Sequence, residues 1–458
     1  MLTQAFKHQQ VIADTVCKKP SVLGTSVALL CECGTGKTRI ILDIIERRGF
    51  TTTLILCPAY VVDTWINEIL KHTTFAFHLF RGTVVQKMER FVNFCMDTGP
   101  RILICSYESY VRWAEILEPK KFEMVVADEA SIFSGYGKTA RLALRKFRNI
   151  KNKAIMTGTI IAEKYQDVFT PFYFLDGGRT FGDSYFYFLK NYFTEDFKGG
   201  WEVTDWGRKT IQQKLKYNPY IFTLSKKECL DLPPKIYQAY YYRMSKDQTK
   251  LDREIVKNWE AKIFNEDGEL VTFEEFSYSI QILQKRMQIC SNFMYIENGD
   301  NKKTIYRIPG KNQKLAVVQD FIKENRDEGI IIVYQYKAEE EILKEAGFKI
   351  FESHKDIKSF PGILACQIDK IKMGVDGFQD VANIAIFFSN KLSLKDRIQC
   401  EDRLHRSGQK KSVVIVDFIC NGAYDAQIYY ILKEKKKPLL ELYNAYTESN
   451  RFDRLRIS

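Results

Sequence analysis

The residues with the most recognisable chemistry follow the first apolar run of the chain. Residues 26–30 form an apolar run that begins with a serine, residues 31–38 read Cys-Glu-Cys-Gly-Thr-Gly-Lys-Thr, and residues 39–48 have a helical pattern. Glycines let successive backbone N–H groups face one anion, and the N-terminus of a following helix adds positive potential. Lys37 can then reach the β- and γ-phosphates of a nucleotide while the Thr38 hydroxyl ligates Mg²⁺. The segment predicts a phosphate-binding loop. Its first residue is a cysteine where the full pattern has glycine, and a glycine-rich turn with a surface lysine is the alternative.

Two adjacent carboxylates follow a second apolar run. Residues 124–127 are apolar, and Asp128 and Glu129 come directly after them. Carboxylates at the end of a buried strand are costly unless they meet a cation or take part in chemistry. We assign Asp128 to Mg²⁺ and Glu129 to the base that polarises an attacking water. A solvated loop is the alternative, and the phosphate loop about ninety residues earlier argues against it.

A pair of arginines lies late in the chain, within residues 399–409, which read Gln-Cys-Glu-Asp-Arg-Leu-His-Arg-Ser-Gly-Gln. Arg403 and Arg406 are three residues apart, so on a helix they would share one face. A planar guanidinium suits bidentate contact with a phosphoryl group during transfer. The pattern predicts arginine fingers that complete a nucleotide site, and a basic helix on a solvated surface is the alternative.

The elements that must position these residues alternate between strands and helices. Short apolar runs recur in the first 160 residues and again late in the chain, which is typical of parallel sheets wound with helices. The expected strands are 26–30, 53–57, 102–105, 124–127, 154–156, 330–334, 350–351, 362–365, 383–388 and 413–418. The sequence predicts an α/β fold with two parallel-sheet lobes and inserted helical material.

The region between the two halves has a different character. It is aromatic-rich first, then charged and helical over 246–263 and 273–291, with turns at 266–268 and 298–301. We expect four parts, which are a first lobe, an aromatic-rich helical insertion, a second lobe with a helical insertion at about 245–310, and a C-terminal extension. Their bounds are 1–165, 166–230, 231–435 and 436–458.

Composition and charge limit the class of protein. The 458 residues are 45% hydrophobic and 28% charged, which excludes a collagen-like or disordered chain. The net charge of +12 favours a polyanionic partner, because Lys and Arg release the counterions of phosphates. The 11 cysteines lack zinc spacing, so we expect free thiols. Apolar runs are only strand-sized and the N-terminus lacks a secretory signal pattern, which predicts a cytosolic protein without a membrane span.

With these residues the chain resembles superfamily 2 helicases and translocases, and within them the Snf2-like motors on double-stranded DNA. The resemblance extends from about residue 6 to residue 437. Similar segments are 6–9 (Q motif), 54–58 with Trp65 and Glu68 (motif Ia), 102–108 (Ib), 156–159 (III), 232–235 (the Snf2 segment that opens the second lobe), 331–336 (IV), 372–379 (V) and 399–409 (VI).

The resemblance implies two RecA-like lobes that close on ATP and Mg²⁺, and it implies site residues in four groups. The catalytic residues would be Lys37, Glu129, Gln399, Arg403 and Arg406. The nucleotide-binding residues would be Phe6, Gln9, Gly34, Thr35, Gly36, Lys37, Thr38, Asp128, Gly374 and Asp376, with Thr38 and Asp128 on Mg²⁺. The DNA contacts would be Pro58, Thr64, Ser106, Tyr334, Lys372, Trp201 and Trp206, and the coupling residues Thr157 and Thr159. Lys372 stands where the family often has a small residue.

An aromatic stretch over 181–206 allows two interpretations. The rings can pack the inserted subdomain against the first lobe, or they can stack on bases or separate strands. We favour packing, with Trp201 and Trp206 as the exposed exceptions beside Gly199 and Gly200. The basic run 433–437 is interpreted as a solvated helix end rather than a DNA patch.

The function expected from these residues and the resemblance is an ATP-driven DNA translocase or helicase. We expect it to remodel branched DNA by fork regression, branch migration or limited unwinding, on duplex or branched DNA with little sequence preference. The alternatives are a duplex translocase that displaces proteins without separating strands, a nucleotide-gated DNA-binding module, and the motor subunit of a nuclease complex. We further expect a monomer in a bacterial or phage-infected cytoplasm, associated with the nucleoid and with replication or recombination proteins, and a phage origin.

Overall fold

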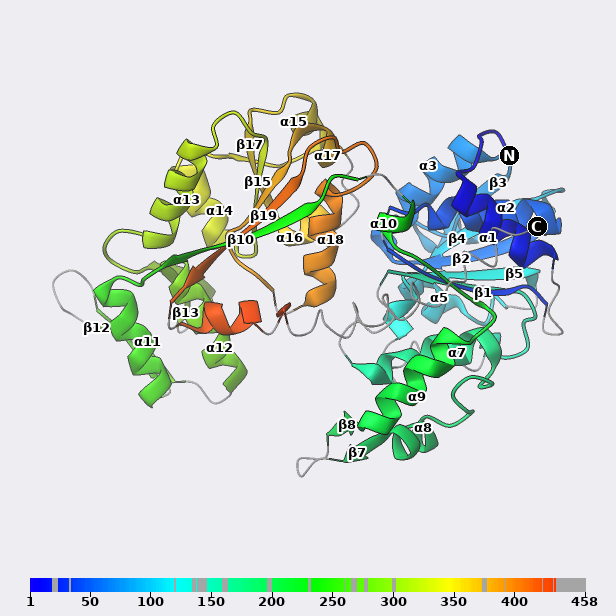
Figure 1. Ribbon diagram of the computed structural model, residues 1–458, viewed down its shortest axis with the longest axis horizontal. Coiled ribbons are helices and arrows are strands. Elements are labelled where there is room, and N and C mark those ends of the chain that lie inside the picture. Colours follow the sequence, from blue (N-terminus) through cyan, green and yellow to red (C-terminus); the bar gives the residue numbers. More distant parts are fainter. Residues whose placement is uncertain are drawn as a thin grey trace. The chain divides into compact units, whose positions relative to one another are not determined.

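A computed structural model describes most of the chain (Figure 1). It describes residues 1–18, 24–32, 34–118, 121–133, 137, 146–158, 164–195, 200–229, 232–258, 260–264, 270–275, 279–298, 302–372, 377–391, 393–421, 423–430 and 432–433. The chain divides into two compact units between residues 231 and 232. We call the described residues 1–229 lobe 1 and the described residues 232–433 lobe 2.

Lobe 1 is built on a seven-stranded parallel sheet in the order β3-β4-β2-β5-β6-β1-β9. Its strands are β1 (Ser26–Cys31), β2 (Thr52–Cys57), β3 (Ala76–Leu79), β4 (Arg101–Ser106), β5 (Met124–Asp128), β6 (Lys153–Thr157) and β9 (Ile221–Leu224). Alternate residues of β1 enter two different apolar clusters, Ala28 and Leu30 in one and Val27 and Leu29 in the other. Both faces of the sheet are therefore buried, which explains why its central strands are mostly apolar.

Helices cover this sheet and continue into the aromatic insertion. They are α1 (Lys7–Lys18), α2 (Lys37–Arg48), α3 (Val62–His72), α4 (Val84–Met96), α5 (Tyr107–Trp113), α7 (Phe169–Asp176), α8 (Tyr185–Tyr192), α9 (Asp205–Lys216) and α10 (Lys226–Cys229), with short 3-10 turns η1 (Ala59–Val61), η3 (Ala130–Phe133) and η4 (Tyr165–Val168). A small hairpin, β7 (Phe193–Glu195) and β8 (Trp201–Val203), joins α8 to α9.

Lobe 2 has a six-stranded parallel sheet in the order β10-β19-β18-β15-β17-β16. Its strands are β10 (Lys235–Tyr242), β15 (Ile330–Tyr334), β16 (Lys349–Ile350), β17 (Ile363–Gln367), β18 (Ile384–Phe387) and β19 (Val413–Cys420). Its helices are α11 (Lys246–Asn258), α12 (Ser279–Cys290), α13 (Gln313–Glu324), α14 (Lys337–Glu345), α15 (His354–Lys358), α16 (Ile368–Lys372), α17 (Phe378–Val381) and α18 (Leu394–Leu404). Figure 1 shows β10 beside β19 at one edge of the sheet.

The two parallel sheets confirm the predicted α/β class, and all ten predicted strands are present. The sequence missed β3, β9 and β10. The two long helices predicted in the insertion are wrong in part, because an antiparallel hairpin, β11 (Glu260–Phe264) and β12 (Leu270–Glu275), occupies residues assigned to them. β-branched and aromatic residues such as Ile263, Val271 and Phe273 favour this pairing over helix.

A second hairpin, β13 (Phe293–Asn298) and β14 (Lys302–Arg307), follows α12. The turn predicted at 266–268 lies entirely outside the described residues, as does most of the turn predicted at 298–301. Within the part of the chain that is described, every helix is too short or too polar to cross a membrane.

Candidate nucleotide site and its surroundings

The phosphate loop lies between the carboxyl end of β1 and the start of α2. Gly34 and Gly36 have φ angles of 85° and 81°, a left-handed conformation that glycine adopts without strain. A Cβ atom added to Gly36 would lie 2.0 Å from Nε2 of Gln9, so a larger residue would displace the Gln9 amide as well as strain the backbone. Thr35 is buried, and its hydroxyl donates a hydrogen bond to the carbonyl of Glu32 at 2.8 Å. The loop is therefore held in the curled conformation that the sequence predicts.

Lys37 is the first residue of α2, and its side chain folds back over the loop. Its Nζ donates to the carbonyls of Cys31 at 2.8 Å and of Glu32 at 3.3 Å. Its charge also lowers the pKa of Asp128, against larger effects that raise it. Lys37 and Asp128 therefore lie within electrostatic reach of each other at the carboxyl edge of the sheet. Thr38 follows at the second position of α2 and is half-buried.

Asp128 ends β5 and is held by three contacts. Its Oδ2 accepts a hydrogen bond from Nε1 of Trp65 at 2.9 Å, and its Oδ1 accepts one from the backbone N–H of Glu129 at 2.9 Å. The hydroxyl of Tyr107 donates to its backbone carbonyl at 2.7 Å. Burial, and then the neighbouring Glu129 carboxylate, raise the pKa of Asp128 to about 6. A buried carboxylate fixed in this way offers a hard oxygen ligand of the kind that Mg²⁺ prefers.

Glu129 has an unusual backbone. Its φ is 51°, one of two positive values among the described non-glycine residues. This conformation costs a non-glycine residue about 1–3 kcal/mol, and such strain clusters at functional sites. The side chain is half-buried beside Asp128. The strained turn therefore places two carboxylates of different exposure next to each other.

The raised pKa of Asp128 predicts how stability depends on pH. In the unfolded chain this carboxyl ionises near pH 3.8, and in the folded protein near pH 6. Folding therefore loses stability as pH rises through this window, and the full cost, on the order of 1–3 kcal/mol, is present above it. We expect Asp128→Asn to raise the melting temperature of the Mg²⁺-free protein at about pH 8. Below about pH 4 the gain should vanish, and an equal gain at both pH values would contradict the assignment.

The segment before α1 meets the phosphate loop. Gln9 is only 4% exposed, and its Oε1 accepts from the backbone N–H of Phe6 at 3.0 Å. Nε2 of His8 donates to the carbonyl of Thr35 at 3.1 Å, and burial lowers the pKa of His8. The rings of Phe6 and His8 stack with centroids 5.8 Å apart, while Phe6 is 60% exposed. The structure thus brings the predicted Phe6 and Gln9 to the loop, together with His8, which the sequence did not single out.

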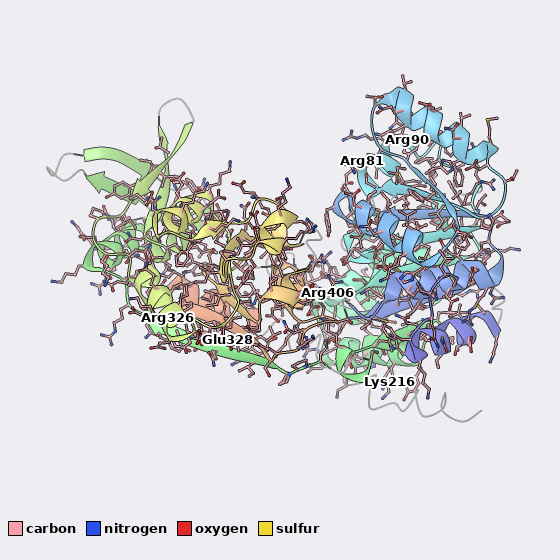
Figure 2. All side chains as sticks on the ribbon, turned by 90° about the horizontal axis from the view of Figure 1, so that it is seen from above. Arg81, Arg90, Lys216, Arg326, Glu328 and Arg406 are labelled. Atoms are coloured by element: carbon pink, nitrogen blue, oxygen red, sulfur yellow. The ribbon has the colours of Figure 1, made fainter. Side chains whose placement is uncertain are left out.

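In lobe 2 the predicted arginine segment lies at the end of α18. Gln399 and Arg403 are on the helix, Arg403 in its last turn. The helix ends at Leu404, so Arg406 (labelled in Figure 2) lies in the turn that follows. Gly408 in this turn has a φ of 103°. The prediction that both arginines share a helical face is therefore wrong, because the chain turns between them.

A buried ion-pair network that the sequence did not indicate joins α18, the helix that carries Arg403, to strand β19. Arg397 of α18 donates to Asp417 of β19 through Nη1 at 2.6 Å and Nη2 at 2.8 Å. Its Nε donates to Glu401 at 2.9 Å, and its guanidinium lies 3.5 Å from the ring centroid of Phe387. Burial alone would lower the pKa of Arg397, but Asp417 and Glu401 outweigh it and raise it. The helix is thereby fixed to the sheet.

Comparison with protein families decides what kind of chain this is. A family model described as SNF2-related domain matches residues 9–294, more than half of the chain. The chain belongs to the SNF2-related family.

Similar proteins support the same family. The chain is 23% identical over 445 residues to "Uncharacterized ATP-dependent helicase MG018" of Mycoplasma genitalium, a match that covers 91% of this chain and 40% of that protein. It is 23% identical over 401 residues to "ISWI chromatin-remodeling complex ATPase ISW2" of Saccharomyces cerevisiae, covering 82% and 35%. The SNF2-related chain thus spans 40% or less of the length of these relatives. They come from a bacterium and a yeast, and the expected phage origin finds no support in them.

A solved structure was also similar. The "Sulfolobus solfataricus SWI2/SNF2 ATPase core in complex with dsDNA" aligns with 100% of this SNF2-related chain and 97% of its own chain, at 18% identity and a TM-score of 0.45.

Several residues predicted to contact DNA lie at the carboxyl edge of the lobe 1 sheet. Pro58 follows β2 and is buried, whereas Thr64 and Ser106 are half-buried. The Ser106 hydroxyl caps α5 by accepting from the backbone N–H of Ser109 at 3.2 Å. Thr157, predicted to couple the two sites, ends β6 and is buried. These positions remain predictions for the SNF2-related chain.

The predicted contact of Tyr334 with DNA needs correction. This tyrosine ends β15 and is fully buried, and its hydroxyl donates to Glu340 of α14 at 2.7 Å. The structure therefore does not offer this hydroxyl to a DNA phosphate, because the ring points into the core beneath α14. Gly374, Asp376 and Thr159 lie outside the described residues, as does the side chain of Lys372.

Most aromatic rings of the insertion pack against lobe 1, as predicted. Phe181, Phe188, Tyr192 and Phe193 are buried in a lobe 1 cluster. Trp206 is 62% exposed, as predicted, and stacks on Tyr192 with centroids 5.7 Å apart.

Other rings of the insertion differ from the prediction. Trp201 is only half-buried and packs against the same cluster, so the prediction that it is exposed is wrong in part. Phe186 and Tyr187 of α8 are 55% and 66% exposed, which the packing interpretation did not anticipate.

Proposed function

We propose that this chain hydrolyses ATP to move along double-stranded DNA and displaces bound proteins without separating the strands. The observation that carries the proposal is the grouping of Lys37, Asp128 and Glu129 at one edge of the lobe 1 sheet, in a member of the SNF2-related family. A phosphate loop, a metal-binding carboxylate and a base are needed for hydrolysis, whereas nucleotide binding alone needs no base.

The proposed roles follow from the positions of the side chains. Lys37 and the loop N–H groups bind the β- and γ-phosphates, and Phe6 and Gln9 bind the base of the nucleotide. Thr38 and Asp128 would hold Mg²⁺, which neutralises charge on the phosphates when bound. Glu129 accepts a proton from the attacking water.

The remaining roles belong to lobe 2. Arg403 and Arg406 stabilise the charge that develops on the phosphoryl group, with Gln399 beside them. Loss of these contacts when the phosphoryl group leaves would couple hydrolysis to movement.

Substituting Lys37 tests the phosphate loop. Lys37→Ala should weaken ATP binding by about 10- to 100-fold and abolish measurable turnover, because a charge-assisted contact to the phosphates is lost. Binding can be followed with a fluorescent ATP analogue. Lys18→Ala, which removes an exposed lysine at the end of α1, is the matched control and should behave as the unmodified protein. Near-normal turnover of Lys37→Ala would remove this lysine from the site.

DNA is the proposed polyanionic partner. The net charge of +12 favours phosphate contacts, and such contacts carry little sequence information. Affinity for DNA should therefore fall steeply with added salt and vary little with sequence.

Remodelling of branched DNA is the second candidate function. The observation that favours it is the set of exposed rings on the insertion, Trp206, Phe186 and Tyr187, because unpaired bases stack on exposed aromatic side chains. Lys190 of α8 lies 4.6 Å from the ring centroid of Phe186 and adds positive charge there.

One assay separates the two functions. ATPase rates are compared with single-stranded, duplex, forked and four-way DNA. Equal stimulation by duplex and branched forms supports the duplex translocase, and a clear preference for forked or four-way DNA supports the second candidate. A rate that stays at background with every form would contradict both and favour a nucleotide-gated binding module.

A further inference from the structure

The last turn of α18 is held by the first strand of lobe 2. Lys235, at the start of β10, places its Nζ 2.9 Å from Oδ1 of Asp402 and 3.4 Å from Oε2 of Glu401. Both carboxylates are buried, Glu401 to 1% and Asp402 to 8% exposure. Buried carboxylates are strongly destabilising without a partner, so this lysine is needed where it lies. Asp402 directly precedes Arg403 in the chain.

Two further contacts join the same segments. The hydroxyl of Tyr237 donates to Oε2 of Glu401 at 2.7 Å, and Nε2 of His405 donates to the carbonyl of Pro233 at 2.8 Å. The contacted residues therefore lie on both sides of Arg403 in the chain, Glu401 and Asp402 before it and His405 after it. Residues 233–237 alternate in their contacts as a strand does, because every second residue points the same way.

The opposite side of Glu401 is also occupied. Arg397 donates to Oε1 of Glu401 at 2.9 Å and is itself bound by Asp417. Glu401 thus accepts from Lys235, Tyr237 and Arg397, and its position is fixed from two sides. A carboxylate with this many charge-assisted contacts has little freedom to move.

These groups keep their charge states through the neutral pH range. Burial alone would lower the pKa of Lys235, but Asp402 and Glu401 outweigh it and raise it, so Lys235 stays cationic. Burial, and then Glu401, raise the pKa of Tyr237, so its hydroxyl stays protonated and can donate. The contacts of Pro233, Lys235 and Tyr237 with Glu401, Asp402 and His405, which we call the β10–α18 link, therefore persist across the neutral pH range.

The β10–α18 link lies at the very start of lobe 2. Lobe 2 begins at Leu232, so Pro233, Lys235 and Tyr237 are among its first residues and follow the connection from lobe 1 directly. We propose that Lys235 and Tyr237 are positioning residues that set Arg403 and Arg406 for ATP hydrolysis. This inference rests on the proposed role of the two arginines.

The test uses the smallest change that breaks the link. Tyr237→Phe removes one hydroxyl, and Tyr241→Phe makes the same change on the same strand, where the hydroxyl interacts with Tyr430 instead of α18. We expect Tyr237→Phe to lower kcat for ATP by about 3- to 10-fold with KM within about twofold, since misplaced catalytic groups slow the chemical step. Tyr241→Phe should leave both unchanged.

A second variant extends the test. Lys235→Met should lower kcat by about 10- to 100-fold. The paired variant Lys235→Met with Asp402→Asn removes both charges, so it should fold while still losing kcat. Melting temperatures are measured for all variants, and if Lys235→Met does not fold, Tyr237→Phe decides.

Arg406→Ala, assayed in parallel, distinguishes the role of the arginines from the positioning role of Lys235 and Tyr237. If it lowers kcat while Tyr237→Phe and the folded Lys235 variants match Tyr241→Phe, the positioning role is overturned and the arginine role stands. If Arg406→Ala itself has a normal kcat, the proposed arginine role fails. A rise in KM alone in Tyr237→Phe would also overturn the inference, because positioning of a transition-state contact changes kcat.

Discussion

Replacing Glu129 with glutamine should lower the DNA-stimulated rate of ATP hydrolysis by about 10³-fold while ATP remains bound. Glutamine keeps the size and the hydrogen-bonding capacity of the side chain but cannot accept a proton from water. General bases contribute about 10²- to 10⁴-fold, which sets the scale. Removing the Glu129 charge also removes one of the causes of the raised Asp128 pKa, so Mg²⁺ binding should not be weakened by a change of protonation.

Steady-state turnover and ATP affinity should be measured on the same preparation. Glu123→Gln is the matched control, because Glu123 lies just before the opposite end of β5 and accepts a hydrogen bond from the backbone N–H of Thr51. This control should retain turnover. Retained turnover in Glu129→Gln would contradict its role as the base, and loss of ATP affinity would point to a structural defect at the strained turn.

Replacing Arg406 with alanine should lower kcat by about 10³-fold with KM for ATP changed by less than about threefold. An arginine that contacts the phosphoryl group mainly in the transition state contributes about 10³- to 10⁵-fold to the rate. Arg406→Lys should recover little, because a lysine cannot make the planar, bidentate contact.

The control for this prediction is on the same lobe. Arg326→Ala removes an exposed arginine that follows α13 and donates to the carbonyl of Lys323 (Figure 2). This variant should have a normal kcat. An effect of Arg406→Ala that is confined to ATP or DNA affinity would count against a role in the chemical step.

The sequence predicted the strands with two buried faces and missed strands at the edges. β1, β5 and β15 are buried along their whole length and almost entirely apolar, because helices cover both sides of their sheets. β10 contains Lys235, Gln238 and four tyrosines, two of them exposed, and it pairs only with β19. An edge strand of this composition has no apolar run or strict alternation from which it can be predicted.

The nucleotide site was predictable where the chemistry is local in sequence. Lys37, Asp128 and Glu129 could be placed together because each follows or ends a strand, and the carboxyl ends of parallel strands lie at one edge of the sheet. The hydrogen bond between Trp65 and Asp128 joins residues 63 positions apart, and no local pattern contains it. The contact of His8 with Thr35 was missed for the same reason.

Two predictions failed because the backbone turned or the side chain was buried. Arg406 was assigned to a helical face, but α18 ends two residues earlier. Tyr334 was assigned to DNA on its motif, but its partner is a carboxylate one turn into the next helix. In both cases the position of the residue in a sequence motif did not determine the direction of its side chain.

The most direct test of the account is displacement of a triplex-forming strand from duplex DNA after addition of ATP. We predict displacement by the unmodified protein at a rate that depends on duplex length, with none by Glu129→Gln under the same conditions. Robust ATP hydrolysis on duplex DNA without any displacement, or displacement that proceeds equally well in Glu129→Gln, would contradict movement driven by this site.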